Sequence, residues 1–424
     1  MMAHSASMEA FPTWAHFTRV RFAGVKLADV GDGKGQGLVA TAKLSHDEAA
    51  ATEVNECAVL RIPSDLVLSA EAVDAYAKVD HNFKQLLDVA GRKASLKAKL
   101  AALQTEFELL HDLSEDLPFW NTLFWTQETI LLEDWLLVDA WYRSRCLELP
   151  TSGTAMVPAL DMVNHSGQPS ALYEEEGTED VVLLVRPETS VSEGKEITIS
   201  YGQAKSASEM LFNYGFVDPS SSVSTNTMTL HLRPLPDDPL AGAKAHIFNG
   251  AKLVKLSSEA GNEDQDRRCT WDSPFIYLMC LNEEDGLSFQ LLQDTEGNRS
   301  LRLFWQEEDV TQRADDFENL IKGHELCQVF RLRAVTIVLQ TVEEQLAGIQ
   351  SGSCDAENEA SQADGILRSD CIVATQLLKD VEEKLLIKAV ESLSQERDAL
   401  LEDDHVVAYL GLAESSDMED ADFS

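Results

Sequence analysis

The alternation of apolar and polar positions changes character several times along the chain. Between Phe22 and Leu44 two short strand-like pieces flank a glycine-rich turn, which predicts a β-hairpin. From about residue 70 to 149 apolar residues recur every three or four positions, the spacing of amphipathic helices, as at Leu96, Leu100, Leu103, Phe107 and Leu110. Strand-like pieces return at 181–185 and 197–201. The pattern predicts short strands interrupted by a helical insert.

A short helix is predicted directly after the last of these strands. Ser206 and Glu209 have the Ser-x-x-Glu spacing of a capping box, and Gly215 is the residue type that ends a helix in a left-handed conformation. We therefore expect Tyr201 to end a strand and Tyr214 to end this helix.

Long amphipathic helices are predicted from about Leu232 onward. One apolar stripe runs from Ala374 to Leu393, and its simplest interpretation is core packing within a helical domain. The acid-rich segments 351–364 and 414–424 are predicted to be disordered. The predicted fold is α+β: a β-rich domain at 18–220 with a helical insert at about 65–150, followed by an all-α domain at 232–412.

Composition narrows the classes of partner. The 424 residues exceed the usual size of one core, which favours two or three domains. The formal net charge of -39 argues against direct nucleic-acid binding and favours a basic protein partner, although acidity also keeps a protein soluble and monomeric. We expect a monomer.

The cysteines and the apolar runs indicate in which cellular compartment the protein is found. Seven scattered cysteines form neither a CxxC pair nor a Cys/His cluster, which favours a reducing compartment and no metal site. The first thirty residues lack a secretory pattern, and no apolar run reaches the ~18 residues of a membrane helix. We expect a cytosolic or nuclear protein that does not bind membranes.

The turn Gly31-Asp32-Gly33-Lys34-Gly35-Gln36-Gly37 is the first candidate for ligand binding. A dinucleotide-binding loop opens a helix, whereas this turn is followed by the strand-like residues 38–41, so a Rossmann or Walker site is disfavoured. Two interpretations stay open: a plain hairpin turn, and a loop whose glycines let the main chain approach a ligand.

The second candidate is the segment Asp161-Met162-Val163-Asn164-His165. An Asn-His pair alone is most often a turn. Here it precedes a strand ending in Tyr201-Gly202 and a capped helix ending in Tyr214-Gly215-Phe216. This ordered set resembles the split-SET protein methyltransferases, in particular the class of the Rubisco large-subunit lysine methyltransferase and several ribosomal-protein lysine methyltransferases.

The resemblance extends over roughly residues 18–412 and implies a β-rich SET domain, a helical substrate-binding domain and the cofactor S-adenosylmethionine. It implies that the cofactor is held by the turn and by four further residues: Lys34, Gly35, Gln36, Gly37, Asn164, His165, Tyr214 and Phe216. Tyr201 would be the catalytic tyrosine, contacting the cofactor and orienting a lysine amine.

The resemblance also implies three residues on the substrate side of the site. Ser144 and Arg145 match the Ser-Arg segment of the family, and Asp161 matches an acid that guides a cationic lysine inward. Two of them have an alternative role: Arg145 as a solvated helix arginine, and Asp161 as a turn-stabilising aspartate. The acceptor is expected to be a lysine of a non-histone, Lys-rich protein such as a ribosomal protein.

Two departures concern the acceptor. Leu147 stands where the family has an aromatic residue, and the insert between Trp125 and Trp135 is short. A related branch that methylates histidine carries Trp where this chain has Leu160, which favours lysine. Protein-histidine methylation and a non-catalytic SET-like scaffold are the alternatives.

Overall fold

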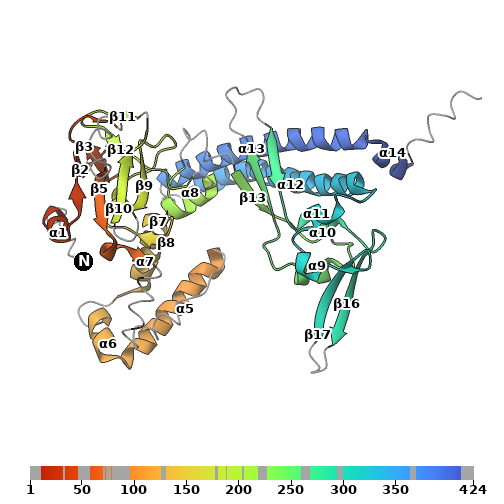
Figure 1. The fold of residues 1–424 in the computed structure, drawn as a ribbon, viewed down its shortest axis with the longest axis horizontal. Helices are drawn as coiled ribbons and strands as arrows, with labels where there is room; N and C mark the ends of the chain where they lie inside the picture. The colour runs from red at the N-terminus through yellow and green to blue at the C-terminus, as the bar shows by residue number, and fades with distance from the viewer. Residues whose placement is uncertain are drawn as a thin grey trace, which may run out of the picture. The chain divides into compact units, whose positions relative to one another are not determined.

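The computed structural model describes most of the chain, in two units divided between Gln203 and Ala204 (Figure 1). The described residues are 11–31, 34–45, 58–69, 72, 78, 96–125, 130–176, 180–187, 189–202, 205–217, 227–258, 268–293, 299–362 and 369–411, without the side chains of 96–99, 102, 120, 123–125 and 352–362. Residues 414–424, which were predicted to be disordered, lie outside this set.

The first unit is built from short antiparallel strands. A short helix, α1 (Phe11–Phe17), precedes them. The strands are β1 (Arg21–Phe22), β2 (Val25–Asp29), β3 (Gln36–Ala40), β4 (Leu44–Ser45), β5 (Ala58–Pro63), β6 (Leu68–Ser69), β7 (Cys146–Leu149), β8 (Gly153–Met156), β9 (Ala171–Glu176), β10 (Asp180–Val185), β11 (Ser190–Val191) and β12 (Glu196–Ile197). They form sheets of order β1-β5-β10-β9, β12-β3-β2, β6-β8-β7 and β11-β4. Fully buried residues such as Leu38, Leu60 and Leu183 form one core between them.

The hairpin predicted around the glycine turn is confirmed. β2 and β3 pair antiparallel from Val25 opposite Ala40 to Asp29 opposite Gln36, so that the turn follows directly on the last pair. β12 adds to the other edge of β3, with Glu196 opposite Val39.

The helical insert is also confirmed, within narrower bounds than 65–150. Its helices are α5 (Leu96–Glu115), α6 (Pro118–Trp125) and α7 (Leu132–Arg145). Residues 68–69 and 146–149, which the prediction included in the insert, are instead strands that both pair with β8. The helices are therefore tied to the sheet at both ends.

The predicted strand at 197–201 is shorter in the structure. β12 ends at Ile197, and Ile199 makes an isolated parallel bridge with His165. The reason is a change of pairing partner: the Ile199 amide donates to the Asn164 carbonyl (3.0 Å), and the Ser166 amide donates to the Ile199 carbonyl (3.0 Å). Tyr201 therefore follows a bridge to the Asn164 segment and does not end a strand.

The second unit contains two small sheets as well as helices. Its elements are α8 (Ala207–Tyr214), β13 (Thr227–His231), α9 (Ala241–Ile247), β14 (Leu253–Ser258), β15 (Cys269–Asp272), α10 (Ile276–Cys280), β16 (Leu287–Gln293), β17 (Arg299–Trp305), β18 (Glu308–Asp309), α11 (Phe317–Ile321), α12 (Cys327–Gln362), α13 (Ser369–Leu401) and α14 (Asp404–Leu410). The sheets have the orders β13-β14-β15 and β16-β17-β18.

The prediction of an all-α second domain is therefore wrong in this respect, although its helices dominate the C-terminal part. The signal that was missed is a short alternation of buried and outward-facing residues, which is typical of strands. Met228 and Leu230 are buried while their neighbours face outward, and Val254 and Leu256 repeat the pattern. Lys244 is enclosed in the same unit, where its ammonium donates to Asp238 and to two main-chain carbonyls.

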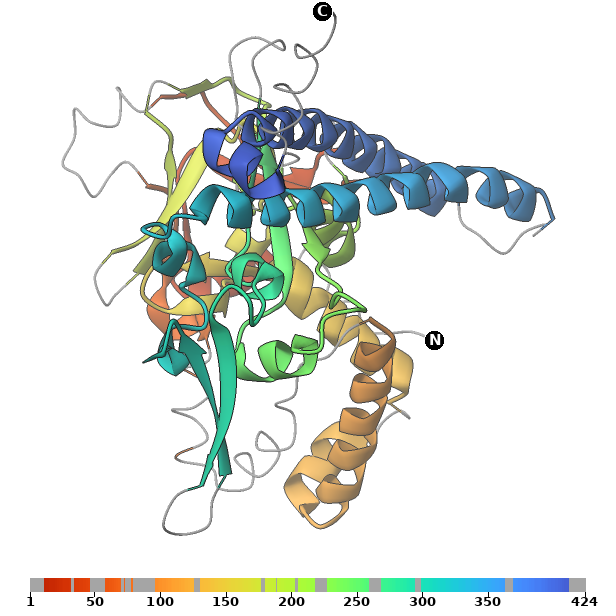
Figure 2. The same cartoon turned by 90° about the vertical axis from the view of Figure 1, so that its right-hand side faces the viewer.

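Two long helices, α12 and α13, lie side by side in both views (Figures 1 and 2). The predicted apolar stripe is confirmed in its C-terminal half, where Leu385, Leu386, Ala389 and Leu393 are buried on α13. Its N-terminal half, from Ala374 to Val381, is only partly buried. The prediction of disorder at 351–364 is wrong for residues 351–362, which continue α12. Adding a residue to an existing helix needs no new nucleus, so a polar stretch can extend a helix that it could not start.

The division at residue 203 also differs from the predicted domain end at 220. α8 packs against α13, and Ser208 of α8 hydrogen-bonds Glu382 of α13. Residues 205–217 therefore belong by their contacts to the second unit.

Candidate active site

The glycine turn is ordered by its own main chain. The Val30 amide donates to the Gly35 carbonyl (3.0 Å) and the Lys34 amide to the Gly31 carbonyl (3.0 Å). Gly35 has φ +74°, a conformation that favours glycine. Of the turn, residues 34–37 lie among the described residues and Asp32 and Gly33 do not.

Gly37 is required for a different reason: its surroundings leave no room for a side chain. A Cβ at this position would lie 2.8 Å from Glu196 Oε1, 2.8 Å from Val30 Cγ1 and 2.9 Å from Asn164 Nδ2. The predicted loop residue Gly37 and the predicted residue Asn164 therefore meet, with a carboxylate between them.

Asn164 is held by two acceptors. Its Nδ2 donates to Glu196 Oε1 at 2.7 Å and lies 3.4 Å from the Gln36 carbonyl oxygen. Among the described residues no donor reaches its Oδ1, which leaves an acceptor beside the turn. Such an oxygen can accept hydrogen bonds from an ammonium group, so this acceptor fits the amino-acid end of S-adenosylmethionine.

His165 and Tyr201 form the next contact along this segment. The Tyr201 amide donates to His165 Nδ1 (3.1 Å), and the two rings lie 5.3 Å apart between centroids. The Tyr201 hydroxyl donates to the Val163 carbonyl (2.9 Å). The predicted catalytic tyrosine is thereby tied at both its main chain and its side chain to residues 163–165.

On the substrate side Arg145 and Asp161 form an ion pair at 3.1 Å between Nη1 and Oδ2. Burial raises the pKa of the Asp161 carboxyl, and Arg145 acts in the opposite direction. Ser144, in contrast, donates within its own helix to the Ala140 carbonyl (2.7 Å). The structure thus joins two of the three predicted substrate residues and engages the third in α7.

Asp161 follows a backbone conformation that is uncommon outside glycine. Ala159 has φ 72°, is 1% exposed, and leads into the 3-10 helix η3 (Leu160–Met162). Conformations of this kind cost about 1–3 kcal/mol and persist where packing enforces them. Here the enforced turn aims the Asp161 carboxylate toward Arg145.

Tyr214 and Phe216 belong to the second unit. Their ring centroids are 6.4 Å apart, and the Lys205 ammonium lies 5.8 Å from the Tyr214 ring centroid. The predicted capping box is confirmed: the Glu209 amide donates to Ser206 Oγ (3.2 Å), the Ser206 amide donates to Glu209 Oε2 (2.7 Å), and Gly215 ends α8 with φ 82°. The helix end that carries Tyr214 is therefore well defined within its own unit.

Glu196 was missed as a site residue. It is the first residue of β12, next to the buried Ile197. It lies opposite Val39, two residues from Gly37, and residues at that diagonal share one face of a sheet. This register is visible only in the structure, so the sequence offered no signal for Glu196.

Both residues that depart from the family pattern lie in the core. Leu147 is 5% exposed and Leu160 is 0% exposed. Neither side chain is therefore available to contact a substrate.

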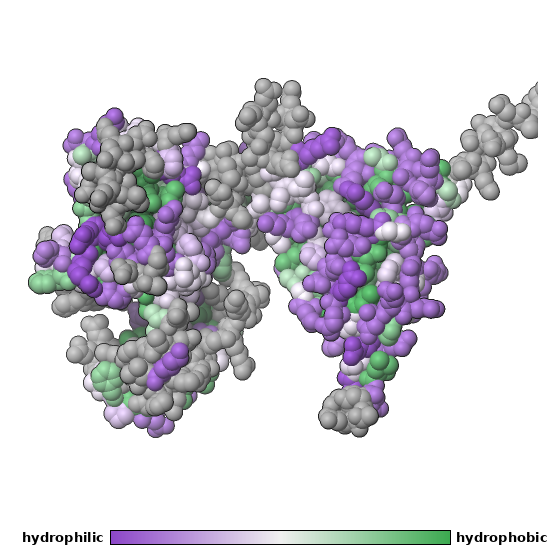
Figure 3. Space-filling model, in the orientation of Figure 1, coloured by the Kyte–Doolittle hydropathy of each residue, from purple (hydrophilic) through white to green (hydrophobic). Residues whose placement is uncertain are grey.

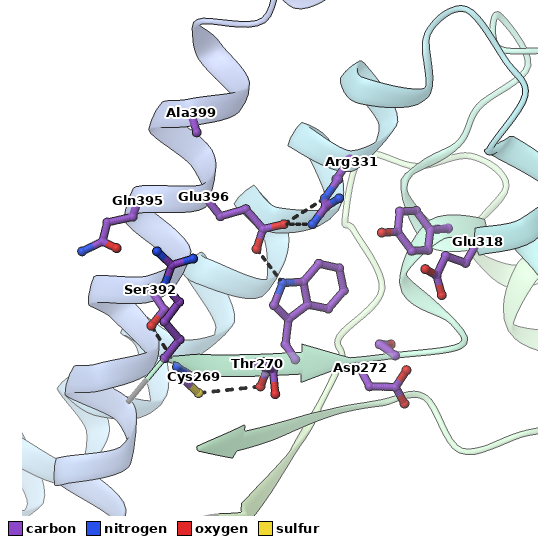
Figure 4. A pocket seen from close by; sticks show the side chains of 13 residues that line it. Cys269, Thr270, Asp272, Glu318, Arg331, Ser392, Gln395, Glu396 and Ala399 are labelled. Atoms are coloured by element: carbon purple, nitrogen blue, oxygen red, sulfur yellow. Dashed lines mark hydrogen bonds and ion pairs between the residues drawn. The ribbon is translucent and has the colours of Figure 1, made fainter. Parts of the chain in front are cut away.

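The second unit contains a pocket of about 560 Å³ that none of the predicted site residues lines (Figure 4). Trp271, Tyr277 and Arg331 contribute to its wall. The Arg331 guanidinium pairs with Glu396 (2.6 Å), whose other oxygen accepts from the Trp271 indole (3.1 Å). Hydrophilic residues dominate the face of this unit that Figure 3 shows.

The described part of the chain contains no group of three His, Cys, Asp or Glu side chains that could hold a metal ion. None of its helices is both long and apolar enough to cross a bilayer.

No protein-family model matches the chain. Over 261 residues it is 27% identical to SET domain-containing protein 8 of Schizosaccharomyces pombe, covering 61% of this chain and 58% of that protein. Over 133 residues it is 28% identical to the chloroplastic ribulose-1,5 bisphosphate carboxylase/oxygenase large subunit N-methyltransferase of Pisum sativum. That match covers 28% of this chain and 27% of that protein. The chain thus spans little more than half the length of the first relative.

Solved structures match almost the whole chain. The SET domain of LSMT bound to lysine and AdoHcy has a TM-score of 0.57 at 19% identity and covers 98% of each chain. Rubisco LSMT bound to AdoMet has a TM-score of 0.54 at 19% identity and covers 95% of this chain and 96% of that one. The chain therefore has the fold of Rubisco LSMT, as the resemblance implied, and is similar in sequence to SET-domain proteins that include protein-lysine methyltransferases.

Proposed function

We propose that the protein is an S-adenosylmethionine-dependent protein-lysine methyltransferase. The observation that carries the proposal is the meeting of Gly37, Asn164 and Tyr201 around residues 163–165, because a main chain without a side chain, an amide oxygen and a hydroxyl are brought together there. When bound, the cofactor supplies an electrophilic methyl group on a sulfonium. The main chain of Lys34, Gly35, Gln36 and Gly37, with Asn164 and the peptide groups of His165, would hold it.

The chain's own residues would prepare the lysine. A free lysine has a pKa of about 10.4, so a channel must favour the neutral amine by desolvating the ammonium. The amine lone pair would form the new N–C bond as the bond between that methyl group and sulfur breaks, with its electron pair left on sulfur and S-adenosylhomocysteine released. The methylammonium product could then lose a proton to solvent. Positioning alone can contribute up to about 7–11 kcal/mol in well-aligned systems, and Tyr201 is fixed firmly enough to contribute to it.

Asp161 and Arg145 would set the entrance. A carboxylate whose charge is already balanced by Arg145 attracts a cationic lysine without holding it as tightly as an isolated buried carboxylate would.

The test is transfer of label from radiolabelled S-adenosylmethionine to proteins of a host extract, with Tyr201→Phe and Asn164→Ala in parallel. We expect a labelled band from the wild type and at least tenfold less label from each variant. Hydrolysis of the band and analysis of the methylated amino acid distinguishes lysine from histidine. No band, or equal bands from all three proteins, would reject an enzymatic role and leave a scaffold.

We further propose that the protein partner is basic. Besides the net charge of -39, the pocket of Figure 4 is lined by Asp272, Glu318 and Glu396 against Arg268 and Arg331. Because Arg331 already balances Glu396, two carboxylates are left facing one guanidinium. Glu318 is only weakly paired, with Lys322 at 3.9 Å and both side chains 61% exposed.

The double variant Asp272→Asn/Glu318→Gln tests the pocket. We expect it to raise KM for the basic protein while calorimetric binding of S-adenosylhomocysteine stays unchanged. The matched control is Glu283→Gln/Glu284→Gln, which removes the same charge from two exposed residues outside the pocket. An equal rise in KM in both would assign the effect to net charge alone.

We also propose a monomer in a reducing compartment, the cytosol or nucleus. The five cysteines within the described residues are all free. Light scattering of the purified chain and imaging of a fluorescent fusion test the two parts separately.

A further inference from the structure

The geometry around Asn164 assigns a role to Glu196. β12 pairs with β3 so that Glu196 lies opposite Val39 and diagonal to Gly37 on the same face of the sheet. Because Gly37 has no side chain, the carboxylate fills that space and reaches Asn164 Nδ2 at 2.7 Å. The Glu196 side chain is 20% exposed, so this contact is shielded from most of the solvent.

The contact determines which way the Asn164 amide points. The two groups nearest its nitrogen, the Gln36 carbonyl and the Glu196 carboxylate, can only accept hydrogen bonds. An amide turned by 180° would place its oxygen against both of them. The Gln36 contact, at 3.4 Å, is long for a hydrogen bond, so the 2.7 Å bond to Glu196 is the stronger constraint.

We propose that Glu196 is the positioning residue of the cofactor site, and that it acts by keeping Asn164 Oδ1 turned toward the bound cofactor's ammonium. This inference rests on the proposed function. Glu196 acts through Asn164, and the property required of it is an acceptor oxygen at Oε1 rather than a negative charge.

The charge contributes little because its ionic partner is weak. Lys34 Nζ lies 3.8 Å from Glu196 Oε2, and the lysine side chain is 55% exposed. Exposed pairs of this kind contribute only a small part of stability or binding. A glutamine at 196 would therefore keep the required bond, whereas an apolar side chain of similar size would not.

The experiment measures calorimetric binding of S-adenosylhomocysteine to the full chain carrying Glu196→Gln, Glu196→Leu or the control Glu193→Leu, an exposed acid of the preceding turn. We expect binding within about threefold of wild type for Glu196→Gln and Glu193→Leu, and at least tenfold weaker binding for Glu196→Leu. In turnover, Glu196→Leu should raise KM for S-adenosylmethionine with kcat nearly unchanged, the sign of lost ground-state binding.

A second set of variants keeps the inference testable if Glu196→Leu fails to fold. Asn164→Asp places two carboxylates in contact and should abolish binding. Asn164→Asp/Glu196→Gln exchanges donor and acceptor, restores the bond and still presents an oxygen to the ligand, so it should recover at least tenfold of the lost affinity.

The outcomes are distinct. Unchanged binding by Glu196→Leu, equal losses in Glu196→Gln and Glu196→Leu, or no recovery in the exchanged pair would each overturn the role of Glu196. If wild type itself binds no S-adenosylhomocysteine, the proposed function fails first.

Discussion

Arg145 Nη1 lies 3.1 Å from Asp161 Oδ2, so the last residue of α7 is ionically bound to the 3-10 helix that precedes Asn164. The pair joins the end of the helical insert to the segment carrying the Asn-His motif.

The Arg145–Asp161 pair predicts a shift in titration. Burial raises the pKa of Asp161 and Arg145 opposes that rise, so Arg145→Met should raise the pKa further. The ¹³C carboxyl resonance of Asp161 reports the midpoint directly. Arg143→Met, which breaks the pair with Asp139 on the same helix, should leave that midpoint unchanged.

The same shift predicts how stability depends on pH. Because the folded state binds the Asp161 proton more tightly than the unfolded chain, this stabilisation is present below the unfolded pKa of about 3.9. It is lost as pH rises through the raised folded pKa. The unfolding free energy of wild type minus that of Asp161→Asn should therefore fall with rising pH, and a difference that grows instead would contradict the raised pKa.

Tyr201→Phe should separate chemistry from binding. The variant loses the hydroxyl bond to the Val163 carbonyl but keeps the main-chain bond to His165. We expect kcat to fall by about 10²-fold, the scale of losing one positioned donor, with S-adenosylhomocysteine binding within threefold. Tyr173→Phe, which removes a hydroxyl bond to the Glu148 carbonyl, is the control and should keep full activity.

Gly37→Ala should weaken cofactor binding, because the added methyl group has no room in the site. Its Cβ would overlap Glu196, Val30 and Asn164, and overpacking of this kind costs about 1–3 kcal/mol. Calorimetric binding of S-adenosylhomocysteine should weaken by at least about tenfold. Gly348→Ala, on an open face of α12 with nothing within 4 Å, should leave binding intact and stabilise the helix by about 0.5–1 kcal/mol.

Ser206→Ala should loosen the helix that carries Tyr214. The cap accepts from the Glu209 amide, and its loss costs about 1 kcal/mol in unfolding free energy. Urea denaturation checks the stability. Thr336→Ala removes a hydroxyl bonded within α12 to the Leu332 carbonyl and should change stability by less than half as much.

The cysteines offer a test that does not depend on function. Burial raises the pKa of Cys280 to about 12 and that of Cys269 to about 11. Since the thiolate is the reactive form, iodoacetamide at pH 8 should label the exposed Cys371 before Cys269 and Cys280. Peptide mass spectrometry after short labelling measures the order, and early modification of Cys280 would contradict its burial.

The sequence predicted features that are encoded locally. The Ser206–Glu209 capping box, the stop at Gly215 and the β2–β3 hairpin each depend on a few adjacent residues, and each is confirmed. Longer-range features were missed. The end of β12 at Ile197 depends on pairing with Asn164, 33 positions earlier. The helix through residues 351–362 depends on propagation from α12.

The candidate site divides in the same way. Gly37, Asn164 and Tyr201 were identified by their order along the chain, and the structure brings them to one segment. Glu196 could not be identified by order, because its role depends on the space left by a glycine on the neighbouring strand.

Leu147 and Leu160 lie wholly or almost wholly inside the first unit's core. Among relatives, a change at either position would therefore record repacking of a domain interior before it recorded a new acceptor. Selections for altered acceptor preference would gain more from libraries at Ser144 and Cys146, which stay partly exposed at the end of α7 and the start of β7.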